Sequence, residues 1–302
     1  MLPILNYITW NVSPFIYEGE HFAIGWYGTL WVLGLIGMLV TLLSTFKHDG
    51  VPTNLALITF MVTLVCIIYG GHLFQGLFYE WYYTSNNPAH FLGIDWYYRN
   101  HYFEHPWKFL DISHGGFSSH GTAMGVVLAG WLLKKPLNCN MWFMADRAMM
   151  GLCVVAVCVR MGNFVLGEIS GIETAMPWGV KFYDSDYIHH PTQIYEALSF
   201  FLALCVATYL YYRHDAGKYK GLLSGVIMSI ALLLRILIEM VKLPNMQIEQ
   251  NWLLYMGQWL SIPMAIWAIW LVFYSIEQGK SDELKPHIFV SRADKRRLKR
   301  KR

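Results

Sequence analysis

The sequence predicts an all-α integral membrane protein with about seven transmembrane helices, and two observations carry that prediction. The first is composition: 55% of the 302 residues are hydrophobic and only 14% are charged, whereas soluble domains carry about 25% charged residues. The second is the grouping of hydrophobic residues into blocks of about 20, the length that a helix needs to cross a hydrocarbon layer about 30 Å thick. The chain has too few charges to cover a globular surface in water.

Seven hydrophobic blocks are candidate membrane helices. They cover residues 22–46, 54–78, 118–134, 145–166, 192–212, 221–242 and 253–276. We therefore expect one membrane domain over 1–278, followed by a basic cytoplasmic tail over 279–302. The connecting segment 79–117 is rich in tryptophan and tyrosine. Because these rings favour the headgroup level, we expect this segment to lie along the periplasmic membrane interface.

Lysine and arginine are divided unevenly between the two sets of connecting loops. The loops that hold Lys47, Lys134 and Arg213, together with the C-terminal tail, carry the excess. In the outer loops acidic residues offset the few cations, which are Arg99, Lys108, Lys181 and Lys242. Cytoplasmic loops hold such an excess. The N-terminus is therefore expected outside the cytoplasm and the C-terminus inside. At the cytoplasmic end of the fourth block, Asp146-Arg147 is interpreted as a helix-start charge with a topology signal.

Polar residues from five of the expected helices fall at one depth, in the outer third of the membrane. Arg160 lies about 21 Å above the cytoplasmic start of its helix, at 1.5 Å per residue, and Arg235 lies at about the same height. Ionisable residues inside a membrane are energetically costly and are usually functional or paired. The residues at this depth are Tyr27, His72, His120, Arg160, Asn163, Glu168, Arg235 and Glu239. We expect one polar cavity, open toward the outer leaflet.

Two arginines at one depth suggest a phosphate-binding pair. A guanidinium group donates hydrogen bonds in a bidentate fork and keeps its charge, and the obvious phosphate in a membrane is a phospholipid headgroup. His120 is flanked by small residues in Gly-Gly-Phe-Ser-Ser-His-Gly, so another molecule can approach it, and a neutral histidine can act as a general base. The residues alone predict a transferase or hydrolase that uses a phospholipid.

Structural explanations stay open for several of these residues. Arg235 and Glu239 are four residues apart and can neutralise each other. Arg160 has no acidic residue three or four positions away on its own helix, so its partner is an anionic ligand, Glu168 or Glu239. His72 can be a packed, hydrogen-bonded histidine, and Tyr27 can belong to an interfacial aromatic belt.

Motifs of other catalytic classes are absent from the sequence. There is no His-Glu-x-x-His zinc motif and no phosphate-cradling P-loop. The residues around His120 lack the last glycine of the serine-hydrolase elbow. We expect no metal and no other cofactor.

An ordered set of motifs resembles the prolipoprotein diacylglyceryl transferase family. Residues 160–171, Arg-Met-Gly-Asn-Phe-Val-Leu-Gly-Glu-Ile-Ser-Gly, are similar to the family signature Gly-Arg-x-Gly-Asn-Phe-x-Asn-x-Glu-x-x-Gly. The supporting matches are Trp26-Tyr27-Gly28, the segment ending in His120-Gly121, His190-Pro191-Thr192-Gln193-Ile194-Tyr195-Glu196, Arg235 with Glu239, and Gly257-Gln258 before Ser261-Ile262-Pro263. The chain departs from the family pattern at His72, Val159, Leu166 and Ala231.

The resemblance implies transfer of the diacylglyceryl group from phosphatidylglycerol to the lipobox cysteine thiol of a prolipoprotein, the first step of bacterial lipoprotein maturation. It implies three catalytic residues, His120, Arg160 and Arg235. The implied substrate-binding residues are Tyr27, Asn163, Glu168, Gly171 and Glu239. The expected partners are phosphatidylglycerol and prolipoproteins, with no nucleic acid, for a monomer in the bacterial inner membrane.

Two other function classes stay open. A transporter or flippase for an anionic lipid or solute would use the same arginines as a binding site. It would need a polar path through the cytoplasmic half, where the sequence offers only Asp146-Arg147 and loop charges, and an internal repeat is not evident. An intramembrane phospholipid hydrolase would release its product without a peptide acceptor.

Overall fold

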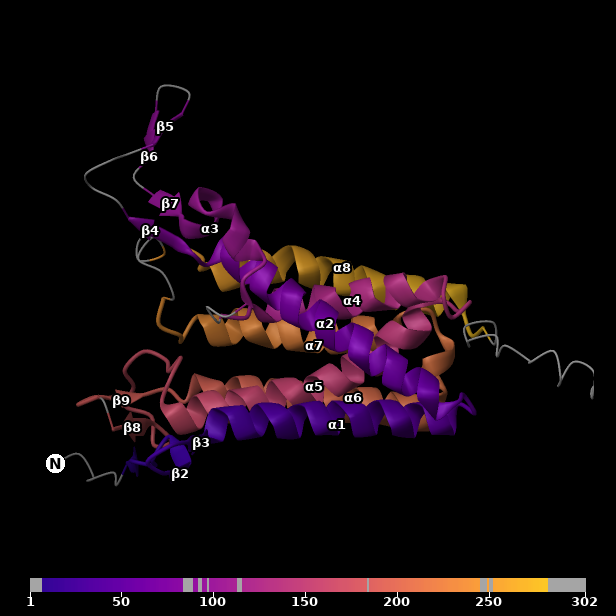
Figure 1. The fold of residues 1–302 in the computed structure, drawn as a ribbon, viewed down its shortest axis with the longest axis horizontal. Helices are drawn as coiled ribbons and strands as arrows, with labels where there is room; N and C mark the ends of the chain where they lie inside the picture. Colours follow the sequence, from indigo (N-terminus) through magenta and orange to yellow (C-terminus); the bar gives the residue numbers. More distant parts are fainter. Residues whose placement is uncertain are drawn as a thin grey trace, which may run out of the picture.

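The computed structural model is a bundle of long helices with small β-sheets at one end (Figure 1). It describes residues 7–83, 89–91, 94–96, 98–112, 116–183, 185–244, 249 and 252–281. Almost all of the expected basic tail, 279–302, therefore lies outside the described residues, as does part of the segment 79–117.

Each of the seven predicted blocks corresponds to one long helix, with ends that differ by a few residues. These helices are α1 (Trp26–His48), α2 (Thr53–Phe78), α4 (Ser119–Lys134), α5 (Met141–Leu166), α6 (Thr192–His214), α7 (Leu222–Glu239) and α8 (Met256–Gln278). Six of them are long and apolar enough to cross a membrane. The other, α4, has 16 residues and is about 24 Å long, which is less than the hydrocarbon thickness of about 30 Å. The all-α membrane class is confirmed, and the count of seven spans stays a prediction.

Most of the short elements lie at the end of the bundle that carries the sheets; η3 lies at the opposite end. The strands are β1 (Ile8–Trp10), β2 (Phe15–Glu18), β3 (Ala23–Gly25), β4 (Trp81–Tyr83), β5 (Ala89–Phe91), β6 (Ile94–Trp96), β7 (Tyr98–Asn100), β8 (Val180–Phe182) and β9 (Ile188–His189). The short helices are α3 (His101–Glu104), η1 (Pro106–Phe109) and η3 (Ala216–Lys218), of which η3 follows α6. In the largest sheet β1 pairs in parallel with β8, and β9 pairs antiparallel with β8. The chain before α1 is thereby tied to the loop between α5 and α6.

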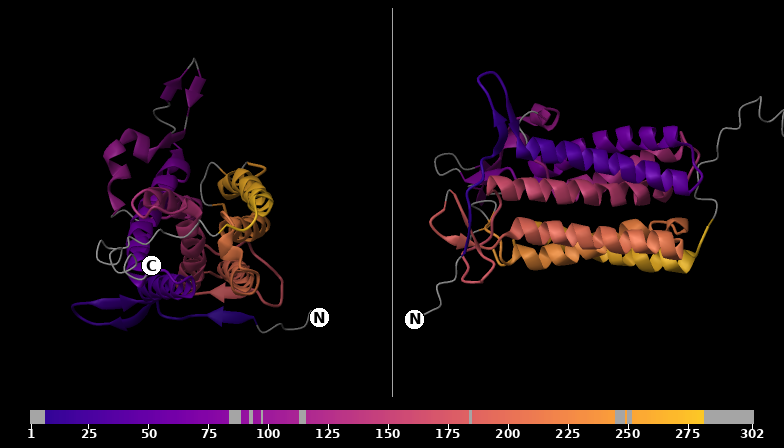
Figure 2. Two further views of the ribbon diagram at one scale, coloured as in Figure 1. Left: turned by 90° about the vertical axis from the view of Figure 1, so that its right-hand side faces the viewer. Right: turned by 90° about the horizontal axis from the view of Figure 1, so that it is seen from below.

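Helix α5 holds the bundle together, because it contacts α1, α4, α6 and α7. Helix α2 packs on α4, and α7 packs on α8. Figure 2 shows α6, α7 and α8 along one side of the molecule, with α1, α2 and α5 along the other. The buried core between them is apolar and includes Met38, Phe143, Met144 and Leu223. The helices alternate in direction, so the ends of α2, α5 and α7 meet the starts of α1, α4, α6 and α8.

The interpretation of Asp146-Arg147 as a helix-start charge is wrong. Helix α5 begins earlier, at Met141, because the Asn140 side chain caps it by accepting a hydrogen bond from the Trp142 amide. Asp146 is buried and accepts hydrogen bonds from the amide and hydroxyl of Ser224 at 2.9 and 2.6 Å. Arg147 is buried too, and its Nη2 lies 2.6 Å from Asp49 Oδ2. Both side chains therefore join helices at the end opposite the sheets.

Glycines allow α2 and α4 to touch along their backbones. A Cβ atom at Gly121 would overlap the carbonyl oxygen of Gly70, and one at Gly125 would overlap that of Cys66. Small residues four positions apart favour such close packing of membrane helices. The contact fixes the first turn of α4, where His120 precedes Gly121.

We predict that Gly121→Ala lowers the free energy of unfolding by about 1–3 kcal/mol, because the added methyl group forces α2 and α4 apart. Thermal unfolding of the detergent-solubilised protein measures the effect. Gly28→Ala is the matched control, since a Cβ atom at Gly28 meets nothing within 4 Å. Equal midpoints for the two variants would contradict the close-packing role.

Candidate active site

A cavity of about 520 Å³ lies between the helices and reaches the end that carries the sheets. Its polar lining comes from helix ends and the loops beside them, and includes Tyr27, Gln75 and His120. Toward the middle of the bundle the lining becomes apolar, with Leu152 and Ile227 among the contributors. The cavity therefore offers a polar mouth and an apolar interior to one ligand.

Six of the eight predicted site residues line this cavity. They are Tyr27, His120, Arg160, Asn163, Glu168 and Arg235. Helices α1, α4, α5 and α7 and the loop after α5 supply them. Glu239 and Gly171 are not part of the lining. The equal depth inferred from the sequence thus corresponds to side chains that share one cavity.

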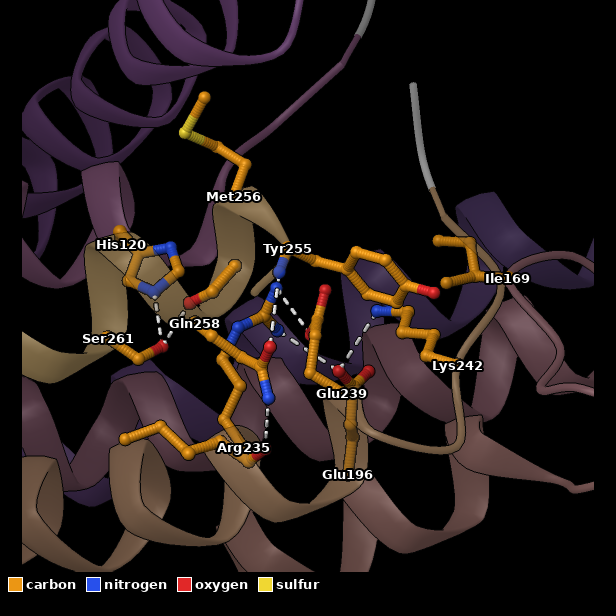
Figure 3. A network of polar contacts seen from close by, with 12 residues as sticks. His120, Ile169, Glu196, Arg235, Glu239, Lys242, Tyr255, Met256, Gln258 and Ser261 are labelled. Atoms are coloured by element: carbon orange, nitrogen blue, oxygen red, sulfur yellow. Dashed lines mark hydrogen bonds and ion pairs between the residues drawn. The ribbon is translucent and has the colours of Figure 1, made fainter. Parts of the chain in front are cut away.

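Glu196 of α6 is the centre of the ion-pair network, which Figure 3 shows in part. Its carboxylate lies 2.6 Å from Arg160 Nε and 3.0 Å from Arg235 Nη1. Lys242 Nζ is a third cation, 3.2 Å from the same carboxylate. The Glu196 side chain is only 2% exposed, and opposite charges compensate a buried charge. One carboxylate thereby fixes the position of three cations, all of which line the cavity.

Both Glu196 and Lys242 were missed as site residues. Glu196 is a lone carboxylate within the apolar block 192–212, and that isolation was the available signal. Lys242 was grouped with the outer loop charges, although it lies seven residues, about two helical turns, after Arg235. The partner of Arg160 is Glu196, not one of the two acidic residues predicted for it.

Arg235 is held by a second carboxylate as well. Glu239 Oε2 lies 3.6 Å from Arg235 Nη2, so the expected pair four residues apart does form. A glycine in α8 makes room for this carboxylate, because a Cβ atom at Gly257 would lie 2.5 Å from Glu239 Oε1. This lack of space explains why the motif has a glycine at position 257.

A hydrogen bond to Ser261 fixes the tautomer of the His120 ring. Its Nε2 lies 2.8 Å from Ser261 Oγ, and the Ser261 hydroxyl donates to the Gly257 carbonyl at 2.5 Å. Because that hydroxyl has one hydrogen, Nε2–H donates to Ser261, and the lone pair of the neutral ring is on Nδ1. Among the described residues, this buried Nδ1 has no hydrogen-bond partner.

Asn163 contacts Arg160, and Tyr27 packs against Gly162, which lies between those two residues in α5. Asn163 Oδ1 accepts a hydrogen bond from Arg160 Nη1 at 3.4 Å. The Tyr27 ring reaches α5 because of a glycine there, since a Cβ atom at Gly162 would lie 2.8 Å from Tyr27 Cδ2. Two residues of the signature, Arg160 and Asn163, thus line the cavity, and Gly162 lets the lining residue Tyr27 pack against α5.

The loop after α5 shapes the cavity mouth with a strained backbone. Gly167 ends α5 in the left-handed conformation with φ 72°, and Ile169 is also left-handed, with φ 61°. That conformation costs a non-glycine residue roughly 1–2 kcal/mol. Glu168 and Ile169 are exposed and line the cavity, and no contact of the Glu168 side chain with Arg160 is found in the described structure.

Gly171 lies behind the cavity wall. Its amide donates to the His190 carbonyl at 2.9 Å, and it forms a β-bridge with Lys242. A Cβ atom here would lie 2.7 Å from His190 Cβ and 2.8 Å from Thr192 Cγ2. The residue therefore allows three chain segments to meet, and its predicted contact with substrate stays a prediction.

The structural explanation of His72 is confirmed. The ring is buried and outside the cavity, its Nε2 lies 2.9 Å from the Lys108 carbonyl, and its edge packs against Tyr102. The Nε2–H group therefore donates to a carbonyl of η1 and holds η1 against α2. Of the other departures from the signature, Ala231 and Val159 line the cavity and Leu166 does not.

The fold and the cavity define a multi-span helical membrane protein that holds paired arginines and a histidine in a site with a polar mouth and an apolar interior. Comparison with known proteins gives the particular family. The family described as prolipoprotein diacylglyceryl transferase matches residues 14–274, and the chain belongs to it.

Three curated relatives carry the name phosphatidylglycerol–prolipoprotein diacylglyceryl transferase. The protein of Chloroherpeton thalassium is 28% identical, over 92% of this chain and 98% of its own length. The protein of Porphyromonas gingivalis is 31% identical over the same shares of the two chains. That of Tolumonas auensis is 31% identical, over 89% of this chain and 98% of its own length. The similarity thus covers nearly the whole of each relative.

We predict that Glu196→Gln lowers the free energy of unfolding by about 3–5 kcal/mol, because the buried Arg235 and Lys242 and the partly buried Arg160 lose the charge that compensates them. Thermal unfolding in detergent measures the loss. Glu168→Gln is the control: it makes the same chemical change at the exposed cavity mouth, where a shift below about 0.5 kcal/mol is expected. Equal losses for the two variants would show that Glu196 is not the centre of the network.

Proposed function

We propose that this protein transfers the diacylglyceryl group of phosphatidylglycerol to the lipobox cysteine thiol of prolipoproteins. The observation that carries the proposal is the joint position of Arg160, Arg235 and His120 in one cavity with a polar mouth and an apolar interior. Family membership and the names of the relatives support the same activity.

The cysteine sulfur attacks the glyceryl carbon, a carbon–sulfur bond forms, and the carbon–oxygen bond to the phosphate breaks. The bonding electrons go to the phosphate oxygen, and glycerol 1-phosphate leaves.

The two arginines would act on the leaving group. Negative charge grows on the phosphate oxygens as the carbon–oxygen bond breaks, and preorganised donors stabilise such charge strongly where water is scarce. Glu196 already holds Arg160 and Arg235 in place, so little reorganisation is needed. Asn163 would orient Arg160, and Glu239 would hold Arg235. Tyr27, Glu168 and Gly171 are proposed to contact or shape the site of the glycerol headgroup.

His120 would act on the nucleophile. A free cysteine thiol has a pKa of about 8.5 and is mostly protonated at neutral pH, although the thiolate is the reactive form. The Nδ1 lone pair of His120 has no partner among the described residues and can take the thiol proton. Ser261 fixes the tautomer that leaves this lone pair free.

We further propose that the protein lies in the bacterial inner membrane with its cavity toward the outer leaflet. The uneven loop charges support an N-terminus outside and a C-terminus in the cytoplasm. In this arrangement α4 also crosses the membrane, which gives seven spans in a membrane domain over 1–278. Segment 79–117 then lies at the periplasmic interface, and 279–302 is a cytoplasmic tail. We propose that the protein works as a monomer.

The direct test uses purified protein, phosphatidylglycerol and a lipobox peptide, with peptide mass and released glycerol phosphate as readouts. Transfer predicts a diacylglyceryl mass gain that is lost when the peptide cysteine is replaced by serine. Lipid breakdown without a change in peptide mass would indicate a hydrolase. No reaction of either substrate in a folded preparation would favour a transporter.

In this assay Arg160→Ala is expected to lower the transfer rate by about 10²–10³, the loss seen when one donor to a developing oxyanion is removed. Arg160→Lys should keep the charge but lose the bidentate geometry, and recover only part of the rate. Arg213→Ala is the control, because Arg213 is exposed and lies at the C-terminal end of α6, away from the cavity. Full activity of Arg160→Ala would contradict the phosphate-binding role.

For His120→Asn we expect a loss of about 10²–10⁴, the usual contribution of a general base. The remaining rate should rise about tenfold per pH unit up to about pH 8.5, because the peptide thiolate then forms without help. The wild-type rate should rise less steeply over this range. Ser261→Ala should cost less than His120→Asn, because it removes the partner of Nε2 and keeps the base. A variant rate that does not change with pH would argue that His120 does not accept the thiol proton.

A further inference from the structure

The start of α6 makes two contacts that the proposed chemistry does not use. Thr192 Oγ1 donates to the carbonyl of Ile169 at 2.8 Å, and Gln193 Nε2 donates to the carbonyl of Glu168 at 2.6 Å. Both side chains are 0% exposed, and neither lines the cavity. The two acceptors are consecutive residues of the strained loop, and both of those residues do line the cavity.

The loop needs such an external hold because its own sequence disfavours its conformation. Ile169 has φ 61°, and a branched side chain makes the left-handed region especially unfavourable. Residues in such conformations persist only where the surrounding structure over-determines them. Here the two carbonyls are fixed by α6, and farther along the Gly171 and Ile172 amides donate to His190 and Val241.

The same helix turn also carries the centre of the ion-pair network. Glu196 follows Thr192 by four residues, one turn of α6, and binds Arg160, Arg235 and Lys242. One rigid turn therefore sets both the cations inside the cavity and the backbone at its mouth. A shift of the loop alone would change the mouth and leave the cations in place.

We propose that Thr192 and Gln193 are positioning residues for the cavity mouth, which hold Glu168 and Ile169 in the strained conformation that makes them part of the cavity lining. The expected effect on lipid binding rests on the proposed function. The expected effect on the loop conformation rests on the structure alone. The mouth is where the glycerol headgroup would be held, so a relaxed loop weakens lipid binding more than it slows the reaction.

The test compares Thr192→Val in three backgrounds at residue 169. With Ile169 present, the variant should raise KM for phosphatidylglycerol about tenfold and change kcat less than about twofold. The same effect is expected in the Ile169→Ala background, since alanine disfavours positive φ as well. In the Ile169→Gly background the effect should largely disappear, because glycine adopts this conformation without help. Thr192→Ser, which keeps the hydroxyl, should restore the wild-type KM.

Equal effects of Thr192→Val in all three backgrounds would overturn the proposal, as would a fall in kcat with unchanged KM, which indicates loss of folded protein. Amide hydrogen exchange of residues 167–172 gives a readout that needs no activity. Exchange should accelerate on Thr192→Val with isoleucine or alanine at 169, and much less with glycine. Where Thr192→Val fails to fold, Gln193→Met takes its place. A wild-type protein without transfer activity would refute the proposed function, and the exchange pattern would still decide on the positioning role.

Discussion

A carboxylate buried among three cations is the constraint on which the rest of the site depends. An arginine or a lysine inside a membrane protein needs a partner, because an unpaired buried charge is very unfavourable. Glu196 supplies that partner to Arg160 of α5, to Arg235 of α7 and to Lys242 beyond α7. The pairing joins α5 and α7 through α6 at the level of the cavity. The same ion pairs therefore position the charged groups of the site and hold the three helices together.

Close backbone contacts are the second requirement, and they explain why glycines recur in the motifs. Gly121 lets α4 approach α2, Gly162 lets Tyr27 approach α5, and Gly257 leaves space for the Glu239 carboxylate. None of these glycines needs to touch a substrate for its replacement to disturb the site. Their chemical role is indirect, since each one sets the distance between a functional side chain and a neighbouring helix.

Much of this site could be predicted from the sequence, because the height of a residue along a membrane helix follows from its position in the hydrophobic block. Position along the helices was enough to predict that Arg160, Arg235 and His120 lie at one level in the membrane. It could not reveal on which side of its helix a residue points, so His72 was placed at the same level although it packs outside the cavity. The contact between Arg160 and Glu196 joins different helices, and no spacing within one helix predicts it. The left-handed conformation of Ile169 could not be predicted either, because contacts with α6 hold it.

The shortness of α4 has a consequence for what the cavity contains. Gly116, Phe117 and Ser118 precede α4 in irregular backbone, and all three line the cavity. Within a bilayer, such irregular backbone is tolerated only where protein covers it or where it faces water. One of its amides, that of Ser118, donates to the Gly71 carbonyl, and the groups that face the cavity need other partners. In the proposed membrane arrangement, the polar mouth of the cavity would have to supply those partners, and the polar headgroup of a bound lipid could do so.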